Sequence, residues 1–416
     1  MKTVAIISSC DTKYQEAIFM RDLLRRYGQE AMVVDMSIGP GESKGADISR
    51  ETVLSNIGVD WKEARTKTKG ELVKIMTDAM KTTVLRLYQD GKIDGVMAAG
   101  GVQNTTVATS AMQLLPIGFP KLIATTVACG QKQFGDVVGL RDIVVIPSIS
   151  DFTGLNMMTR KILSNACACM AGMMQHAGST LVKESGKPVV GVSLMGITNE
   201  GCCAAINELT RRGAEAIGFH TTGVGGSIME QLALNGTIDA ILDMTTHEIT
   251  SEYFGGGFSY GAKNRLTATL EKWIPMVVSV GGLDFVDFRK DAFPPRMNER
   301  VYNMHNAQLA HIKILPDEAV EVGKIFAERL NRSSIPVTLV LPTEGMRKDT
   351  RKGGNLYCKE TDDALLGTIL KNIGPNVRVQ VLEGNLNDVE WGRKIAGIMA
   401  EELVKKGFHL ELEVER

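Results

Sequence analysis

The feature that most constrains this chain is a repeated order of elements: a short apolar run, a loop of small polar residues, and an amphipathic helix. Near-continuous apolar runs rich in β-branched residues are typical of parallel strands that are buried on both faces. The alternation of such strands with helices predicts right-handed crossovers and a doubly wound α/β fold. The expected strands are 3–7, 30–35, 93–98, 121–126, 142–147, 189–194, 214–219, 238–243, 276–280, 312–315, 337–341 and 377–382. The expected helices are 13–27, 105–114, 155–181, 201–212, 227–235, 317–331, 361–372 and 388–406.

Two segments interrupt this order. The polar segment 47–69 contains Trp61 and is expected to form a helical excursion or flap between strands. The chain becomes polar again at 183–188 and then restarts the same order. The sequence therefore predicts two Rossmann-like domains, an N-terminal nucleotide-binding domain at 1–184 and a C-terminal α/β domain at 185–416, with a cleft between them. A length of 416 residues is enough for each domain to bury its own core.

Charge and composition argue against several classes of protein. The formal net charge is −1 and aromatic residues make up 5% of the chain, which gives no reason to expect a nucleic-acid partner. No apolar run approaches the roughly 20 residues that a membrane-spanning helix needs. The seven cysteines show no zinc-ligand spacing, so no metal site is expected and a cytoplasmic protein with free thiols is the simplest interpretation.

Candidate binding residues lie in the loops that follow the strands, because ligands of open parallel sheets bind beyond the carboxyl ends of the strands. Small residues there let a backbone approach a ligand, and the free amides of the next helix attract an anion. Asp35, at the end of the second strand, holds the place where an acidic side chain often binds ribose hydroxyls. The expected cofactor-binding residues are Ser9, Asp11, Thr12, Asp35, Gly100, Gly101, Asn104, Thr105, Thr126, Thr222, Gly223, Gly225, Gly226 and Ser227.

The best two phosphate sites on this argument are Gly100–Thr106 and Gly223–Ser227. The same residue types also serve as ordinary turn and N-cap residues, which is the alternative for any one loop. Neither the G-x-x-x-x-G-K-[ST] motif nor the G-x-G-x-x-G motif is present, which disfavours a Walker-type hydrolase and a standard nicotinamide site.

Acid–base candidates are Asp11, His220 and Glu248. His220 precedes a glycine-rich loop, and a structural role is an equal alternative for it. His247 and Glu248 lack the spacing of metal ligands, whereas Asp284 and Asp287 are able to hold Mg²⁺ through a bound phosphate. Cys10 and Cys129 lie near strand ends, where either a nucleophile or a small core residue fits.

Several stretches together resemble the UPF0261 family, the Tm-1-like ATP-binding domain proteins. They are 34–37 (VDMS), 115–130 (LPIGFPKLIATTVACG), 146–151 (IPSISD), 219–232 (FHTTGVGGSIMEQL), 241–249 (ILDMTTHEI) and 279–288 (SVGGLDFVDF), with Asp11-Thr12-Lys13 at the first strand end. The resemblance covers nearly the whole chain. It implies two Rossmann-like subdomains, ATP binding and self-association as a homodimer or higher homo-oligomer.

Three functions remain open at this stage. The first is an enzyme that binds ATP, with or without Mg²⁺. Its site would also bind a small anionic metabolite that bears a phosphate or carboxylate, and the enzyme would act on that metabolite. The second is a non-catalytic interaction module that is stabilised by nucleotide. The third is an isomerase or lyase that acts on a small acid without nucleotide.

Overall fold

The computed structural model describes residues 1–128, 135–176, 183, 186–263 and 265–412. The chain forms two compact units, Met1–Val182 and Lys183–Arg416. The sequence placed the boundary between residues 184 and 185, and both residues lie outside the described ranges.

Unit 1 is built on a parallel sheet of five strands in the order β2-β1-β3-β4-β5. Its strands are β1 (Thr3–Ser8), β2 (Glu30–Asp35), β3 (Gly95–Gly100), β4 (Lys121–Thr125) and β5 (Val144–Pro147). Its helices are α1 (Cys10–Arg26), α2 (Arg50–Ser55), α3 (Trp61–Ala64), α4 (Lys69–Gln89), α5 (Val102–Met112), α6 (Gly135–Val138) and α7 (Met157–Gln175), with a 3₁₀ turn η1 (Thr126–Ala128).

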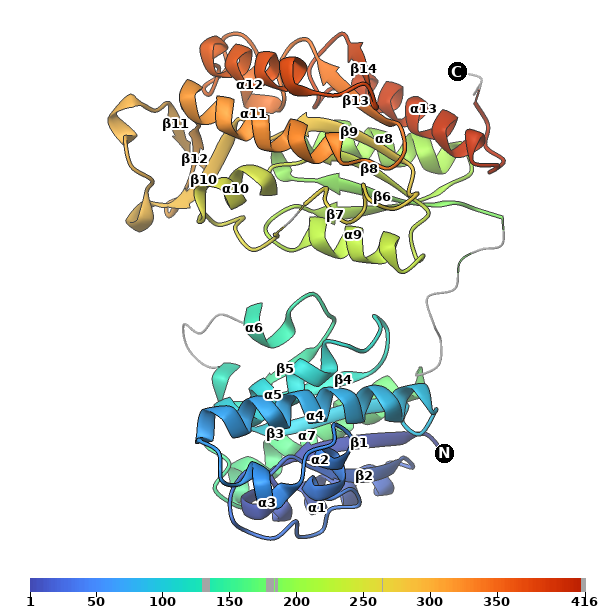
Figure 1. Ribbon diagram of the computed structural model, residues 1–416, viewed down its shortest axis with the longest axis vertical. Helices are drawn as coiled ribbons and strands as arrows, with labels where there is room; N and C mark the ends of the chain where they lie inside the picture. The colour runs from blue at the N-terminus through green and yellow to red at the C-terminus, as the bar shows by residue number, and fades with distance from the viewer. Residues whose placement is uncertain (129–134, 177–182, 184–185, 264, 413–416) are drawn as a thin grey trace. The chain divides into compact units, whose positions relative to one another are not determined.

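Alternation along β1 explains how this sheet is covered on both faces. Val4 and Ile6 are buried with side chains of α1 and α7, whereas Ala5 and Ile7 are buried with side chains of α4 and α5. Figure 1 shows the strands of this sheet among their helices. Strands buried on both faces are what the apolar runs predicted, and the doubly wound α/β fold is confirmed.

Unit 2 repeats this architecture with six parallel strands in the order β14-β13-β9-β8-β6-β7. Its strands are β6 (Val189–Leu194), β7 (Glu215–His220), β8 (Ala240–Thr245), β9 (Met276–Gly281), β13 (Val337–Pro342) and β14 (Val377–Leu382). Its helices are α8 (Asn199–Arg211), α9 (Gly225–Leu234), α10 (Glu248–Phe254), α11 (Pro316–Asn331), α12 (Lys359–Asn372) and α13 (Val389–Lys405). The 3₁₀ turns are η2 (Gly196–Thr198), η3 (Lys290–Ala292), η4 (Met297–Glu299) and η5 (Lys348–Thr350).

The core of unit 2 again fills both faces of the sheet. Val190 and Val192 of β6 pack with apolar side chains of α8 and α13, including Trp391. The residue between them, Gly191, faces the opposite way, and a Cβ there would lie 2.7 Å from Met229 of α9.

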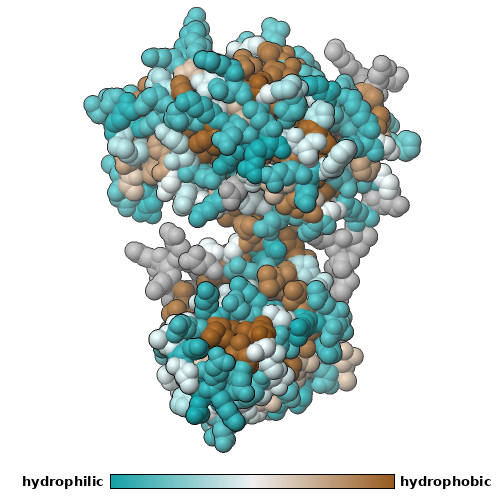
Figure 2. Space-filling view, viewed as in Figure 1, coloured by the Kyte–Doolittle hydropathy of each residue, from teal (hydrophilic) through white to brown (hydrophobic). Residues whose placement is uncertain are grey.

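One part of unit 2 departs from the simple alternation. A small antiparallel sheet in the order β10-β12-β11 is inserted after β9, from β10 (Phe285–Arg289), β11 (Tyr302–Met304) and β12 (Leu309–Lys313). The strand expected at 312–315 therefore lies in this insertion and not in the main sheet. Figure 2 shows hydrophilic side chains over most of the visible face of both units, and no helix of the described residues is long and apolar enough to span a bilayer.

Candidate functional site

A cavity of about 550 Å³ opens in unit 1 at the carboxyl ends of β1 and β3. The chain leaves β1 toward β2 on one side and reaches β3 on the other, so this is the switch point of the sheet, where open α/β sheets bind ligands. The residues that line the cavity are Ser9, Asp11, Thr12, Lys13, Ile38, Gly39, Arg65, Lys67, Lys69, Leu72, Gly101, Val102, Gln103, Asn104 and Asp151. The structure thus brings together five residues that the sequence singled out: Ser9, Asp11, Thr12, Gly101 and Asn104.

Two helices, α1 and α5, begin at this cavity, and their first turns differ in one decisive way. In α1 the amide of Cys10 donates to Asp35 at 3.0 Å and the amide of Asp11 donates to the Ser37 hydroxyl at 2.9 Å. In α5 no side chain caps the helix, and the amides at 102–104 have no hydrogen-bond partner among the described residues. The open N-terminus of α5 is therefore the place for an anion, because its amides and the helix dipole both attract negative charge.

Asp35 has a different position from the one expected for a ribose-binding residue. Its carboxylate is fully buried and accepts hydrogen bonds from the Cys10 amide, the amide and hydroxyl of Ser37, and the hydroxyl of Ser43. It does not line the cavity. Asp35 therefore supports the start of α1 and the loop that follows β2.

The β3–α5 turn is held from inside by Asn104. The Ser9 hydroxyl donates to Asn104 Oδ1 at 2.9 Å, and Asn104 Nδ2 donates to the Ala99 carbonyl at 3.2 Å. Gly100 has a φ of +154°, and a Cβ at this residue would lie 2.5 Å from the Asn104 amide nitrogen. Glycine is required here because only a residue without a side chain leaves room for Asn104.

Thr105 and Thr126 stand behind this turn rather than in the cavity lining. The Thr105 hydroxyl donates to the Gly101 carbonyl at 2.8 Å and lies 2.6 Å from the Thr125 hydroxyl, which links α5 to β4. Thr126 begins η1, and its hydroxyl would be 3.8 Å from a Cβ at Gly101.

Three of the four basic side chains that line the cavity come from a segment for which the sequence predicts no ligand contact, and the fourth is Lys13 of α1. Arg65, Lys67 and Lys69 follow α3 and begin α4, where Thr68 and Glu71 form a capping box. The sequence predicts a helical excursion or flap at 47–69, and the structure forms α2 and α3 there; ligand contacts are predicted only in loops that follow strands. The Lys67-Thr68-Lys69 run at a capped helix start is the signal that would have found them.

The loop after β2 forms another wall and is clamped in place. The Arg50 guanidinium, stacked 4.0 Å over the Trp61 ring, donates to the carbonyls of Gly39 (2.6 Å) and Gly41. The Gly39 amide donates to Asp11 Oδ2 at 3.0 Å. Asp11 is thus oriented by this loop and remains part of the cavity lining.

The second expected phosphate loop, in unit 2, packs against a buried ion cluster. The Gly223 amide donates to Glu248 Oε1 at 2.7 Å, and Glu248 Oε2 is paired with Arg265. Arg265 also pairs with Glu230 at 2.8 Å and Asp243 at 2.5 Å, and all four charged side chains are buried. Burial raises the pKa of Glu248 above its ordinary value, and Arg265 opposes that effect.

The other residues of this loop differ in their surroundings. His220 is exposed at the end of the edge strand β7, with Nδ1 3.3 Å from the Thr222 hydroxyl. Gly225 and Ser227 begin α9, which has no side-chain cap. Gly226 has no room for a side chain, because a Cβ would lie 2.0 Å from Arg265 Nη1. The acid–base candidates are therefore not equivalent: Asp11 lines a cavity, His220 is on the surface, and Glu248 is buried in an ion cluster.

The remaining candidates have structural surroundings. The Cys10 thiol is buried beside Asp35, and burial and that negative charge raise its pKa far above the ordinary value, so it is no nucleophile. Cys129 lies outside the described residues. No group of three His, Cys, Asp or Glu side chains able to hold a metal ion occurs in the described ranges.

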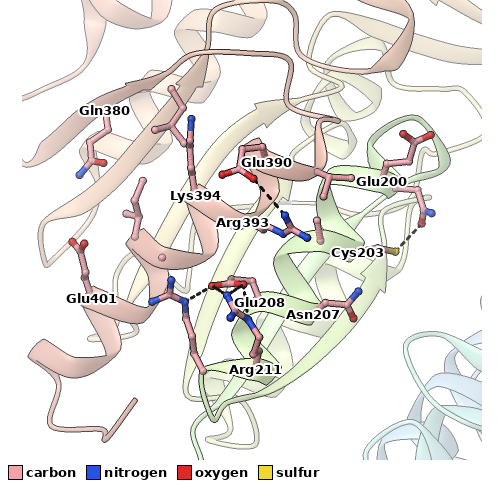
Figure 3. A pocket seen from close by; sticks show the side chains of 17 residues that line it. Glu200, Cys203, Asn207, Glu208, Arg211, Gln380, Glu390, Arg393, Lys394 and Glu401 are labelled. Atoms are coloured by element: carbon pink, nitrogen blue, oxygen red, sulfur yellow. Dashed lines mark hydrogen bonds and ion pairs between the residues drawn. The ribbon is translucent and has the colours of Figure 1, made fainter. Parts of the chain in front are cut away.

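A larger groove, of about 1,270 Å³, runs between α8 and α13 on the outside of unit 2 (Figure 3). Several of its charged side chains pair with one another, as Glu208 does with Arg211 and Arg212, and Glu390 with Arg393. It is lined mainly by α8 and α13, with Gln380 and Leu382 of the edge strand β14, and contains none of the candidate site residues predicted from the sequence. We therefore take the unit 1 cavity as the candidate site.

Comparisons with known proteins agree along nearly the whole chain. The family model described as "Uncharacterised protein family (UPF0261) N-terminal domain" matches residues 2–179, and its C-terminal counterpart matches residues 187–403. A "UPF0261 protein" of Clostridium tetani is 33% identical over 400 residues, covering 95% of this chain and 97% of that protein. The "ToMV resistance protein Tm-1(GCR237)" of Solanum lycopersicum is 33% identical over 432 residues, covering 98% of this chain and 56% of the tomato protein.

Among solved structures, UDP-GlcNAc 2-epimerase from Neisseria meningitidis aligns over 97% of this chain and 100% of that chain at 10% identity. Its TM-score is 0.24, and a score this low carries no argument about function.

Proposed function

The chain belongs to the UPF0261 family, and from the geometry of its unit 1 cavity we propose that it binds a nucleoside triphosphate, ATP, there. The observation that carries the proposal is the uncapped N-terminus of α5, which opens into a cavity that also contains the side chains of Lys67 and Lys69. Free amides, a helix dipole and flexible ammonium groups are the donors that a chain of phosphates needs.

The other lining residues fit the remaining parts of a nucleotide. Asp11 is the acidic side chain available to sugar hydroxyls, because Asp35 is occupied by internal donors. Ile38 and Leu72 supply apolar surface for a base. A volume of about 550 Å³ lies in the range of small-molecule sites.

Mg²⁺ is compatible with this site only as a partner of the phosphates. Asp11 and Asp151 are the two carboxylates of the lining, and Mg²⁺ in nucleotide sites is commonly held by one or two carboxylates, phosphate oxygens and water. When bound, the ion would neutralise phosphate charge, and Asp151 would be the carboxylate that holds it, because Asp11 is assigned to the sugar hydroxyls.

The test is calorimetric titration of the full chain with ATP, ADP, AMP and adenosine, each with and without Mg²⁺. We expect the affinity to fall in that order, because each phosphate adds contacts with α5 and the lysines. Equal binding of adenosine and ATP, or a rise in melting temperature with small acids but not with ATP, contradicts the proposal.

Turnover separates the catalytic and non-catalytic alternatives. Incubation with ATP, Mg²⁺ and a panel of phosphorylated and carboxylated metabolites gives a product if the chain is an enzyme. Binding without a product from any member of the panel favours a nucleotide-stabilised module. Cytoplasmic location and self-association stay predictions from the sequence.

A further inference from the structure

Two of the three guanidinium nitrogens of a buried arginine in unit 2 have no hydrogen-bond partner in the part of the chain that the structure describes. The side chain of Arg347 is 0% exposed, and its Nε donates to the two oxygens of Asp284 at 3.1 and 3.0 Å. Its Nη1 and Nη2 are buried without any hydrogen-bond partner among the described residues. Unsatisfied buried donors on a charged group are costly, so such a group calls for a ligand or another acceptor.

The position of Arg347 in the fold is one where ligands bind. Arg347 lies in the loop that follows β13, and its partner Asp284 lies in the loop that follows the neighbouring strand β9. Both loops are at the carboxyl edge of the parallel sheet of unit 2. Every residue of this site belongs to unit 2, so the inference does not depend on the nucleotide cavity of unit 1.

Aromatic rings hold the guanidinium plane in place. Arg347 Cζ lies 4.3 Å from the centre of the buried Phe285 ring. His247 stacks on the same ring at 4.1 Å, and His311 meets it edge-on at 5.0 Å. A guanidinium fixed at Nε and stacked on a ring presents its two Nη atoms in a constant direction.

One carboxylate already approaches the free end of Arg347. Asp349 Oδ2 lies 3.5 Å from Nη1, which is an ion pair without a hydrogen bond. Its side chain is 31% exposed, in the 3₁₀ turn η5, whereas Arg347 is fully buried. Asp349 is therefore the most exposed of the charged groups paired with Arg347, and its side is the one that lies toward solvent.

We propose that Nη1 and Nη2 of Arg347 bind the carboxylate of a small organic acid. Two neighbouring Nη atoms match the two oxygens of a carboxylate, and such bidentate pairs are among the strongest charge-assisted hydrogen bonds in proteins. The negative charges of Asp284 and Asp349 stand close by and disfavour a dianionic phosphate. The site thus selects a singly charged carboxylate end.

His311 provides an independent readout of occupancy. Burial, the positive charge of Arg347 and the neighbouring His305 lower its pKa to about 4. A carboxylate on Arg347 neutralises that charge, so the pKa of His311 should rise on binding. The buried Asp287 and the stacked His247 also face this region, and both are present in every protein compared.

The experiment titrates the full chain with acetate, pyruvate and succinate, and with inorganic phosphate for contrast, by calorimetry and by NMR of the histidine rings. We expect the carboxylates to bind, Arg347→Lys to weaken them by about ten-fold or more, and the His311 signals to titrate at higher pH when a carboxylate is present. His311→Gln identifies those signals.

Asp349→Asn is the second variant. Its result tests the proposal even if the Arg347→Lys protein does not fold. Because it removes a competing carboxylate from Nη1, it should tighten carboxylate binding several-fold, which a purely structural role of Arg347 would not produce. Absence of carboxylate binding, binding of phosphate alone, or unchanged affinity in Asp349→Asn overturns the proposal. ATP affinity of Arg347→Lys should equal that of the original chain, which keeps this result separate from the test of the nucleotide site.

Discussion

Ser9 Oγ lies 2.9 Å from Asn104 Oδ1, and this buried hydrogen bond joins the ends of β1 and β3 across the switch point of the first sheet. Asn104 is 5% exposed, and its Nδ2 donates to the Ala99 carbonyl. Its side chain therefore makes internal hydrogen bonds. The consequence for function is indirect. Asn104 fixes the turn from which α5 presents its free amides to the cavity.

Asn104→Ala should therefore lower both stability and ATP affinity. The change leaves the Ser9 hydroxyl and the Ala99 carbonyl without their buried partner, which costs about 1–3 kcal/mol of unfolding free energy. Urea unfolding and calorimetric titration measure the two effects. Gln103→Ala, in the same turn, keeps this bond and should leave the unfolding free energy within about 0.5 kcal/mol of the original. Equal stability of the two variants would contradict the structural role given to Asn104.

The lysines of the α3–α4 segment offer a test in which folding is not at issue. Lys67 and Lys69 are exposed side chains that line the cavity. Replacing both by Ala should weaken ATP binding by about ten-fold with little effect on the melting temperature, because exposed ion pairs add little stability. The loss should shrink at high ionic strength, where charges are screened. Lys62→Ala is the matched control, since Lys62 is exposed on α3 but does not line the cavity. If Lys62→Ala weakens ATP binding as much as the double variant does, Lys67 and Lys69 act only through the overall charge of the protein.

The sequence predicts both main sheets because their central strands, such as Met276–Gly281, are apolar runs buried on both faces. Runs such as Glu30–Asp35 and Val377–Leu382 were placed with the bounds that the structure has. The sequence pattern predicts neither the insertion β10–β12 nor the helix α4, which begins at the end of the polar segment 47–69. Short antiparallel strands with exposed residues, such as Tyr302–Met304, carry no continuous apolar signal.

The candidate site was predictable only in part, and for a physical reason. The identity of residues at strand ends shows which side chains can reach the carboxyl edge, and this gave Asp11 and Asn104. It does not show at which helix N-terminus the free amides donate to an internal acceptor. The amides of Cys10 and Asp11 at the start of α1 donate to Asp35 and Ser37, which come from the end of β2 and the loop after it, and this loop has no regular sequence pattern. The Arg265 cluster joins Glu230, Asp243 and Glu248, which are separated along the chain and meet only after folding.

Gly226→Ala tests whether the second glycine-rich loop is packed as the structure has it. The added Cβ would lie 2.0 Å from Arg265 Nη1 and 2.1 Å from Glu248 Oε2, so the buried ion pair must separate or the loop must move. Breaking a buried pair typically costs about 3–5 kcal/mol, which urea unfolding resolves. Gly367→Ala is the control in the same unit. It lies in α12 with nothing within 4 Å of its Cβ, so Ala should raise the unfolding free energy by up to about 1 kcal/mol. A neutral Gly226→Ala would show that this loop is not held against Arg265.

The pH dependence of stability should carry a signature of Asp362. Its carboxylate is paired with Lys313 at 2.6 Å, yet burial and the neighbouring Asp284 raise its pKa from 3.8 to about 6. The pKa of Asp284 is lowered to about 2, because this carboxylate is paired with both Lys313 and Arg347. A carboxyl whose pKa is higher in the folded state contributes stability that is complete below pH 3.8 and is lost as the pH rises through 6.

Asp362→Asn removes that titration while keeping the size of the side chain. The unfolding free energy of the original chain minus that of the variant should therefore decrease as the pH rises from about 4 to about 6, and then level off. His311 titrates in the same window with the opposite sign, because its pKa is lowered to about 4 in the fold, but it is present in both proteins and cancels in the difference. Urea unfolding of both chains at half-unit intervals of pH gives the curve. A difference that is flat, or that increases with pH, would mean that Asp362 is charged in the fold over the whole range and that Lys313 outweighs the effect of burial.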